Sequence, residues 1–254
     1  MTCNEWRFLD VSYDTVYRNL ALEEALISSE HAAAEIPKVR VWFNPAAVVV
    51  GRFQDVHLEA DLAFCTRRNI AIARRFTGGG TVYQDEGSLN LTIVTKEPVI
   101  DLEKIQHRNI AVMKETLLRM GVESDVTDSN SITVMSRKIS GASLAVKHNL
   151  VLWHASLLVS TDLEVITQVL SPSRKRFTTN RVRSRWQPVT NLRTALSQHV
   201  ETLKVKEQVL NSIEHIFKVQ LRKCQLSPSE RIRSNELYDL KYVTTEWNNE
   251  GIVK

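Results

Sequence analysis

The chain has 254 residues, 43% of them hydrophobic and 24% charged, with a formal net charge of +4. This length and composition can bury one large core, so we expect a single domain over residues 1–254. No stretch approaches the roughly 18 apolar residues of a membrane span, and no signal-peptide pattern opens the chain, which predicts a cytoplasmic protein without a membrane partner. The cysteines Cys3, Cys65 and Cys224 are too widely spaced to indicate a zinc or redox motif.

The first part of the chain predicts strands and helices in mixed order. Apolar periodicity and turn residues indicate a strand over residues 6–11, a helix over 15–29, strands over 39–43 and 47–50, and a helix over 58–68. Asp14 is the expected N-cap of the first helix. The turn pair Asn44-Pro45 predicts that the two neighbouring strands form a hairpin.

The remainder of the chain continues in the same manner. Strands are expected over 70–75, 89–95, 131–134, 137–140 and 151–159, and helices over 102–120, 161–170, 205–216 and from Pro228 onward. Gly121 should end the long helix, and Thr161 should open a capping box. Strands grouped around helices without a regular βαβ order predict an α+β fold, in which helices cover mixed, largely antiparallel sheets.

The segment RRFTGGGTVYQD, which begins at Arg74, is the most informative part of the sequence. Three consecutive glycines, Gly78, Gly79 and Gly80, follow an apolar run, and their N–H groups can form a concavity that binds an anion. Arg74 and Arg75 supply charge-assisted donors for a carboxylate or phosphate. The segment matches neither a Walker nor a Rossmann phosphate loop. It therefore predicts a site for a small acidic molecule, with a glycine-rich hairpin bend as the alternative.

A second basic region lies further along the chain. No carboxylate occurs between Val165 and Val200, whereas seven side chains there are basic: Arg174, Lys175, Arg176, Arg181, Arg183, Arg185 and Arg193. Such a block attracts nucleotide phosphates, an acidic partner domain or nucleic acid, and a solvated loop is the alternative. Aromatic side chains are not interleaved there as stacking platforms for bases, so nucleic acid is not the expected ligand.

The glycine segment resembles the signature of the lipoate–protein ligases, which reads Arg-Arg-x-x-Gly-Gly-Gly-x-Val-x-His-Asp-x-Gly-x-x-Asn. The match continues through Val82, Asp85, Gly87 and Asn90, with Gln84 where the family usually has histidine. The resemblance implies the catalytic fold of biotin and lipoate ligases and an ATP-dependent reaction with Mg²⁺. In that reaction lipoate becomes lipoyl-AMP and is then transferred to a lysine of a lipoyl-carrier protein, such as a dehydrogenase-complex E2 domain or a glycine-cleavage H protein.

The resemblance also implies roles for individual residues. Lys138, with Gly141 and Ala142, matches the family's motif for the lysine that binds the acyl carboxylate and the adenylate phosphate. A fixed cation there lowers the repulsion between two anions and stabilises the charge that develops. Asn130 matches the family's Asn-Asp pair, but Ser131 replaces the aspartate, which could weaken a magnesium or nucleotide contact.

Further residues complete the implied site. His154 and Ala155 match a strand that lines the family's active site, although a structural histidine is an equal alternative. Arg183 and Arg185 fall in a segment similar to the family's mobile cover of the adenylate. The residues implied to cradle the acyl-adenylate are Arg74, Arg75, Thr77, Gly78, Gly79, Gly80 and Val82, and those implied to border the acyl tail are Trp42 and Val49.

Two other functions stay open at this point. One is an octanoyl or lipoyl transferase that uses a cysteine thioester or pre-made lipoyl-AMP, which would require an activated thiol near Lys138. The other is a basic nucleic-acid-binding module. Residues 242–248 resemble the motif that closes the family's catalytic domain, so an accessory domain is expected to be absent or to be supplied as a separate subunit.

Overall fold

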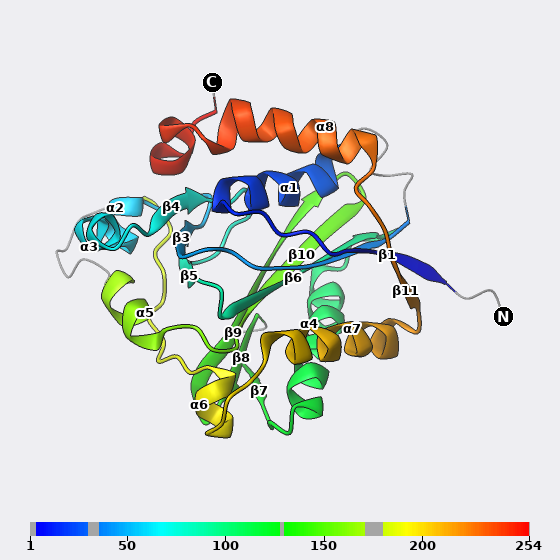
Figure 1. Cartoon of the computed structure of the whole chain (residues 1–254). Helices are drawn as coiled ribbons and strands as arrows, with labels where there is room; N and C mark the ends of the chain where they lie inside the picture. The colour runs from blue at the N-terminus through cyan, green and yellow to red at the C-terminus, as the bar shows by residue number, and fades with distance from the viewer. Residues whose placement is uncertain (1–3, 30–35, 128–129, 171–179, 254) are drawn as a thin grey trace.

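The computed structural model describes residues 4–29, 36–127, 130–170 and 180–253, which contain two β-sheets and the helices around them (Figure 1). The larger sheet has the order β11 (Gln220–Lys223), β1 (Glu5–Leu9), β2 (Lys38–Trp42), β6 (Ser88–Lys96), β10 (Leu150–Leu158), β9 (Arg137–Lys147), β8 (Ser131–Val134), β7 (Asp125–Thr127). The smaller sheet has the order β4 (Ala71–Arg74), β3 (Ala47–Val50), β5 (Val82–Gln84). β1 pairs in parallel with β2 and β11, and β3 with β4, whereas every other pair is antiparallel.

Helices cover both faces of the larger sheet. α4 (Leu102–Arg119) and α7 (Thr202–Phe217) share a core cluster with one face, and α1 (Val16–Ser28) packs on the other with α8 (Pro228–Leu237), as Figure 1 shows. Shorter elements complete the fold: α2 (Val56–Glu59), α3 (Leu62–Arg67), α5 (Leu163–Val169), α6 (Leu192–Leu196) and the π-helical turns η2 (Tyr238–Tyr242) and η3 (Glu246–Glu250). No helix within the described ranges is long and apolar enough to cross a membrane.

Side-chain alternation in the central strands decides where a polar site can form. In β6, Leu89, Leu91 and Ile93 enter the core cluster beneath α4 and α7. Asn90 and Thr92 point to the opposite face, because successive side chains of a strand alternate. One face of the sheet is therefore an apolar core, and the other carries buried polar groups.

The predicted α+β fold with mixed, largely antiparallel sheets is confirmed. The long helix ends where expected, since Gly121 adopts a φ of 79° after it. The last α-helix starts at Pro228, and Ser227 and Glu230 form a reciprocal capping box at its start. That the chain is a single domain stays a prediction.

The predicted hairpin is wrong, because β2 and β3 belong to different sheets. β2 pairs with β1 and β6, whereas β3 pairs with β4 and β5. The Asn44 side chain is buried and hydrogen-bonds Asn19 and Gln84. The segment after β2 thus carries the chain from one sheet to the other rather than reversing it.

Three local predictions also fail, and in each case a side-chain cap decides the outcome. The helix expected over 58–68 is two helices, because Asp61 accepts a hydrogen bond from the Phe64 N–H and starts α3. Thr15, not Asp14, caps α1. Asp162, not Thr161, caps α5, since the Thr161 hydroxyl is hydrogen-bonded to Ser88.

Candidate active site

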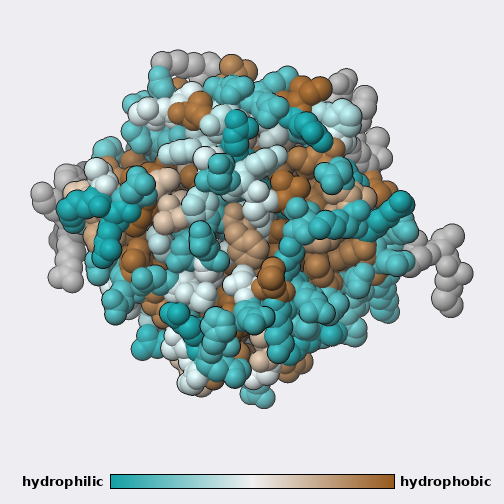
Figure 2. Space-filling view, in the orientation of Figure 1, coloured by the Kyte–Doolittle hydropathy of each residue, from teal (hydrophilic) through white to brown (hydrophobic). Residues whose placement is uncertain are grey.

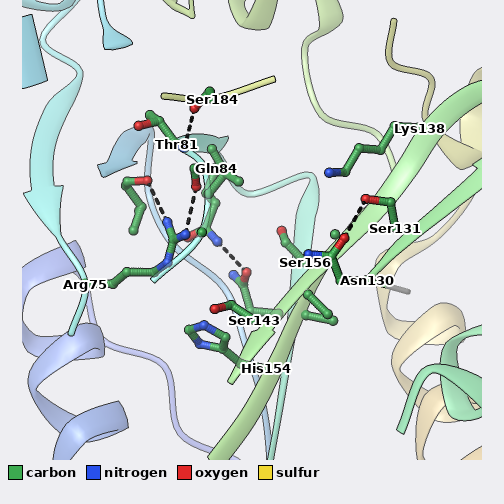
Figure 3. A pocket seen from close by; sticks show the side chains of 18 of the residues that line it. Arg75, Thr81, Gln84, Asn130, Ser131, Lys138, Ser143, His154, Ser156 and Ser184 are labelled. Atoms are coloured by element: carbon green, nitrogen blue, oxygen red, sulfur yellow. Dashed lines mark hydrogen bonds between the residues drawn. The ribbon is translucent and has the colours of Figure 1, made fainter. Parts of the chain in front are cut away.

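A pocket of about 520 Å³ lies between the two sheets. Its walls come from the polar face of the large sheet, from β3 and β5, from the glycine loop, and from residues 184–187. Figure 3 shows Lys138 reaching in from one side of the pocket and Arg75 lying on the opposite side. No carboxylate of the described ranges lines this pocket, so its charged groups are all cationic.

The floor of the pocket is one row of side chains that crosses five antiparallel strands. Trp42 pairs with Asn90, Asn90 with Ser156, Ser156 with Gly141, and Gly141 with Ser131. Directly paired residues in antiparallel strands share a face of the sheet. All five line the pocket, and we call them the pocket row.

Lys138 lies over the glycine of that row. A Cβ added to Gly141 would stand 2.9 Å from the Lys138 Cε and 3.0 Å from its Nζ. The absence of a side chain at position 141 therefore lets the ammonium group lie against the sheet. Residues 184–190, which we call the covering segment, hold the backbone of Lys138. The Lys138 N–H donates to the Pro188 carbonyl at 2.8 Å, and the Lys138 carbonyl accepts from the Thr190 N–H at 2.9 Å.

Arg75 shapes the glycine loop. Its Nη2 donates to the carbonyls of Gly78 and Gly80 at 2.6 and 2.7 Å, and its Nη1 donates to the Val49 carbonyl at 3.1 Å. Burial lowers the pKa of this guanidinium to about 10. The loop also needs glycine at Gly79, where φ is 88°. Arg75 is thus a buried cation whose hydrogen-bond acceptors are all neutral, which leaves its positive charge uncompensated beside the pocket.

The segment that covers the pocket is fastened at Ser184. The Ser184 Oγ accepts from the Thr81 N–H and from the Gln54 Nε2, both at 2.9 Å. The Ser184 N–H donates to both carboxylate oxygens of Glu59 at 3.2 Å. These contacts place the next residue, Arg185, in the wall of the pocket.

A second row, directly beside the pocket row, is occupied by a closed polar network. Arg40 pairs with Thr92, and Thr92 with His154; we call these three residues the buried row. His154 pairs in turn with Ser143, which lines the pocket. Glu23 of α1 joins the buried row. It accepts from Thr92 at 2.6 Å, forms an ion pair with Arg40 at 3.2 Å and is hydrogen-bonded to the His154 Nδ1 at 3.1 Å.

The network gives both ring nitrogens of His154 a partner within the protein. A carboxylate only accepts, so the Nδ1 facing Glu23 carries a hydrogen, and the Nε2 is hydrogen-bonded to the Thr77 hydroxyl at 2.9 Å. Thr77 in turn accepts from the Arg75 Nε at 3.0 Å. Burial raises the pKa of Glu23, but the hydrogen bond from His154 and the charge of Arg40 outweigh burial and hold that pKa below its usual value. His154 is therefore a satisfied structural histidine that also borders the pocket.

The structure brings most of the expected site residues together. Those that line the pocket are Trp42, Val49, Arg75, Gly79, Gly80, Val82, Asn130, Lys138, Gly141, Ala142, His154, Ala155 and Arg185. The two positions that depart from the signature, Gln84 and Ser131, line it as well. Ala155 does so although it belongs to the core cluster on the other face of the sheet.

Four expected residues lie outside the pocket wall. Arg74 is fully buried and donates to backbone carbonyls, among them those of Gln54 at 2.7 Å and Asn249 at 2.7 Å, so it ties the carboxy-terminal turns to the loop. Thr77 and Gly78 bond Arg75 behind the loop. Arg183 turns away to pair with Glu59 at 3.2 Å. Arg174, Lys175 and Arg176 fall outside the described residues.

The sequence reasoning also missed several wall residues, namely Leu20, Thr81, Ser143, Ser156, Ser184 and Gln187. Strand alternation could have found two of them, because Ser156 follows His154 by two residues and Ser143 follows Gly141 by two. The others come together only through the tertiary fold.

A second cavity of about 480 Å³ adjoins the first and shares Lys138 and Arg185 with it. Its remaining wall is largely apolar and includes Leu158, Ile166 and Trp186. Lys138 therefore stands where two cavities meet.

Of the described cysteines, Cys65 shares a core cluster with Leu158 and Ile166, which line the second cavity. Neither Cys65 nor Cys224 contributes to the walls. Burial raises the pKa of the Cys65 thiol to about 11, which disfavours the thiolate that a thioester mechanism requires.

A cationic pocket, floored by an antiparallel sheet and bordered by a glycine loop, is typical of a protein that binds a small anionic molecule. The family model described as "Lipoyl protein ligase A/B catalytic domain" matches residues 15–214, and the chain belongs to this family.

Named relatives agree with the family. Lipoate-protein ligase A subunit 1 of Thermoplasma acidophilum is 27% identical, with 91% of this chain and 90% of that protein covered. Lipoate–protein ligase 1 of Staphylococcus aureus is 26% identical, with 91% of this chain and 69% of that protein covered. Both comparisons extend over most of the chain.

Solved structures are similar over nearly the whole chain. A putative lipoate protein ligase from T. acidophilum with bound lipoic acid has a TM-score of 0.86 at 27% identity, covering 98% of this chain and 100% of that one. A lipoate-protein ligase A bound with ATP also has a TM-score of 0.86, at 26% identity with the same coverage.

Proposed function

We propose that the chain is the catalytic part of a lipoate–protein ligase that activates lipoate with ATP and transfers the lipoyl group to a lysine of a carrier protein. The observation that carries this proposal is the position of Lys138, over Gly141 at the junction of the two cavities. One cation there can contact a carboxylate in the first cavity and a phosphate in the second. The relatives bound to lipoic acid and to ATP support both ligands.

The first chemical step joins two anions. A lipoate carboxylate oxygen attacks the α-phosphorus of ATP, the bond to the β-phosphate oxygen breaks, and pyrophosphate leaves with the electron pair. Lys138 and Arg185 reduce the repulsion between the reactants, and the uncompensated charge of Arg75 adds to the positive potential. These groups are fixed before the reaction, so they cost little reorganisation during it.

The second step forms the amide. The neutral amine of the carrier lysine attacks the carbonyl carbon of lipoyl-AMP, AMP leaves as the phosphate anion, and the amine loses its proton to solvent. The contribution of the protein here is to hold the mixed anhydride in place for the incoming amine. The covering segment, held by Ser184 and by the backbone of Lys138, shields the anhydride from water.

The two cavities differ in a way that assigns the two halves of lipoyl-AMP. The first is bordered at one end by Trp42 and Val49, which suit an aliphatic tail. The second is lined by apolar Leu158 and Ile166 and by Trp186, which suit a flat purine ring. We therefore propose that the acyl chain lies along the sheet toward β2 and the adenosine lies beneath the covering segment.

The described walls do not form a dedicated magnesium site. Mg²⁺ prefers carboxylate and phosphate oxygens, and the walls of the first cavity offer only amide and hydroxyl oxygens such as those of Asn130 and Ser131. No cluster of three potential metal-binding side chains occurs in the described ranges. We propose that Mg²⁺ arrives on the phosphates of ATP, and no step above depends on it.

Macromolecular partners follow from the same relatives. One similar structure, 26% identical, is titled as a bi-partite lipoate protein ligase and its E2 lipoyl domain from T. acidophilum. This supports an E2 lipoyl domain and an accessory polypeptide as partners of this chain, and an H protein stays an alternative carrier. Figure 2 shows hydrophobic residues exposed among hydrophilic ones on the upper side, where Figure 1 places α8. Exposed Ile232, Leu240 and Val243 belong to α8 and the turns after it.

Mass spectrometry of a purified apo lipoyl domain tests the proposal. Incubation with this protein, lipoate, ATP and Mg²⁺ should add one lipoyl group to the domain, and omission of ATP should abolish the gain. A gain that needs an acyl-thioester donor instead of ATP would assign the chain as a transferase. Pyrophosphate release measured with and without a second polypeptide shows whether the accessory part is required for the first step.

A further inference from the structure

Two polar atoms of the pocket row have no hydrogen-bond partner. The Asn90 side chain is only 2% exposed, and its Nδ2 has no acceptor among the described residues. The neighbouring Ser156 Oγ is also buried and unpaired within the same ranges. Buried polar groups are usually hydrogen-bonded, so each unpaired one requires an explanation. Both residues line the pocket, where a ligand can supply the missing partner.

A chain of buried amides fixes the orientation of Asn90. It starts at Arg40, whose Nη2 donates to the Asn19 Oδ1 at 2.7 Å, and an arginine can only donate. The Asn19 Nδ2 then donates to the Asn44 Oδ1 at 2.8 Å. The Asn44 Nδ2 donates to the Gln84 Oε1, and the Gln84 Nε2 donates to the Asn90 Oδ1, both at 2.6 Å.

This chain has a direction. Each amide accepts from the previous residue through its oxygen and donates to the next through its nitrogen. Flipping the last amide would set two NH₂ groups, those of Gln84 and Asn90, against each other. Asn90 therefore presents its NH₂ group, and not its oxygen, as the unpaired atom in the pocket.

The register of the sheet gives the position of that donor. Asn90 is two strands away from Gly141, over which the Lys138 ammonium lies, and Trp42 is one strand further. At the usual strand spacing the distance from Gly141 to Asn90 is about 10 Å. An acid whose carboxylate meets Lys138 would thus place the far end of its chain beside Asn90 and Trp42.

We propose that Asn90 is a specificity-determining residue, which donates a hydrogen bond to a heteroatom at the far end of the acyl chain. This deepens the proposed function and rests on it, because it takes Lys138 as the site of the carboxylate. The dithiolane ring of lipoate carries sulfur atoms there, and sulfur is a weak acceptor. A hydrocarbon ring of the same shape leaves the NH₂ buried and unpaired, which lowers affinity.

The test compares two acids that differ only in those sulfur atoms. Calorimetry measures the Kd of lipoate and of cyclopentylpentanoate, in which methylene groups replace both sulfurs. Wild type should bind lipoate about fivefold more tightly, as one neutral hydrogen bond allows. Asn90→Leu should bind the two acids with equal Kd. The control is Asn109→Leu, because Asn109 is 1% exposed and also has an unpaired buried atom, but lies in α4 outside the pocket.

The outcomes separate this inference from the ligase assignment. Equal Kd values in wild type, or an unchanged preference in Asn90→Leu, would overturn the role of Asn90, and the wild-type comparison is decisive even if the variant fails to fold. A preference lost in Asn90→Leu and kept in Asn109→Leu supports it. Pyrophosphate release from ATP is measured separately. Failure there both with and without an accessory polypeptide, with the expected Kd pattern, would overturn the ligase function while keeping the contact with the acid.

Discussion

The buried row and the pocket row lie side by side on the same strands, but they differ in whether their polar atoms have hydrogen-bond partners. In the buried row, Arg40, Thr92 and His154 all bond one carboxylate, that of Glu23. In the pocket row, Asn90 and Ser156 each retain an unpaired atom. The same sheet thus carries one row whose polar atoms are hydrogen-bonded within the protein and, two residues away along each strand, a second row with unpaired polar atoms.

The difference separates stability from binding. A closed network rigidifies the site, but removing one member leaves a buried charge without its partner. An open row contributes little to folding and is completed only by a ligand. Substitutions in the buried row should therefore act mainly on the free energy of unfolding, and those around the pocket row mainly on activity.

Removing the carboxylate that the buried row binds should give the largest effect, a loss in the free energy of unfolding. Glu23→Gln leaves the Arg40 guanidinium buried without its counter-ion, so we expect a loss of about 3 kcal/mol in the free energy of unfolding. Urea denaturation measures it. The matched control is Glu115→Gln, whose partner Arg119 is one helical turn away at the surface, and a change under about 0.5 kcal/mol is expected there. Equal losses of unfolding free energy in Glu23→Gln and Glu115→Gln would show that the buried row contributes no more to stability than a surface ion pair.

The carboxylate of Glu23 also makes the free energy of unfolding depend on pH. Because the pKa of Glu23 in the folded chain is lower than the usual 4.5, its stabilisation is present above that value and is lost as the pH falls below it. Wild type should therefore lose more stability than Glu23→Gln on acidification through this range. Parallel stability profiles of the two proteins below pH 4.5 would contradict the ionised state assigned to Glu23.

Lys138→Ala tests the pocket side of the comparison. We expect lipoylation of the carrier to fall about 100-fold or more, because the ammonium group acts on both reacting anions, while the free energy of unfolding stays nearly unchanged. Single-turnover kinetics with ATP and lipoate measure the loss. The control is Lys147→Ala, an exposed lysine of the same strand. Activity of Lys138→Ala near that of the control would remove Lys138 from the mechanism.

The sequence predicted the parts of the site that depend on backbone chemistry. The glycine loop could be found because few residues other than glycine allow a φ of 88°. Lys138, Gly141 and Asn130 were predicted from the resemblance to the ligase family, and all three line the pocket. The long helix before Gly121 was equally clear, since its apolar spacing and its terminator agree.

The sequence could not reveal which side chains contact each other when they lie far apart along the chain. Arg74 and Arg75 are adjacent in a doubly basic motif, but only the packing of the carboxy-terminal turns shows that Arg74 is structural. Ser184 falls in the segment similar to the family's cover of the adenylate, but its bond to Thr81 could not be predicted, because it joins residues 103 positions apart. The buried amide chain depends on β2 and β3 entering different sheets, which local turn chemistry predicted wrongly.

Gly141→Ala should give a smaller effect that operates through Lys138. The added methyl group would displace the Lys138 amine, which is the flexible end of a side chain, so the fold should tolerate it. We expect about a tenfold loss of lipoylation. The double substitution Gly141→Ala with Lys138→Ala should be no slower than Lys138→Ala alone, since residues that act as a unit are not additive. Full additivity would show that Gly141 serves the ligand or the strand directly.

Ser184→Ala should give the smallest effect, because it loosens the cover without touching the floor of the pocket. The substitution removes the acceptor of the Thr81 N–H, at a cost of about 1 kcal/mol to the closed arrangement. A reduced closed population raises the apparent KM for ATP by about fivefold and leaves the affinity for lipoate unchanged, because the acyl end lies on the sheet. Ser28→Ala is the control, since its hydroxyl bonds the Glu24 carbonyl in α1 away from the pocket. A matching rise in the Kd for lipoate would show that the covering segment and the pocket row bind the substrate as one unit. The two could then not be separated into a segment that closes and a row that is preformed.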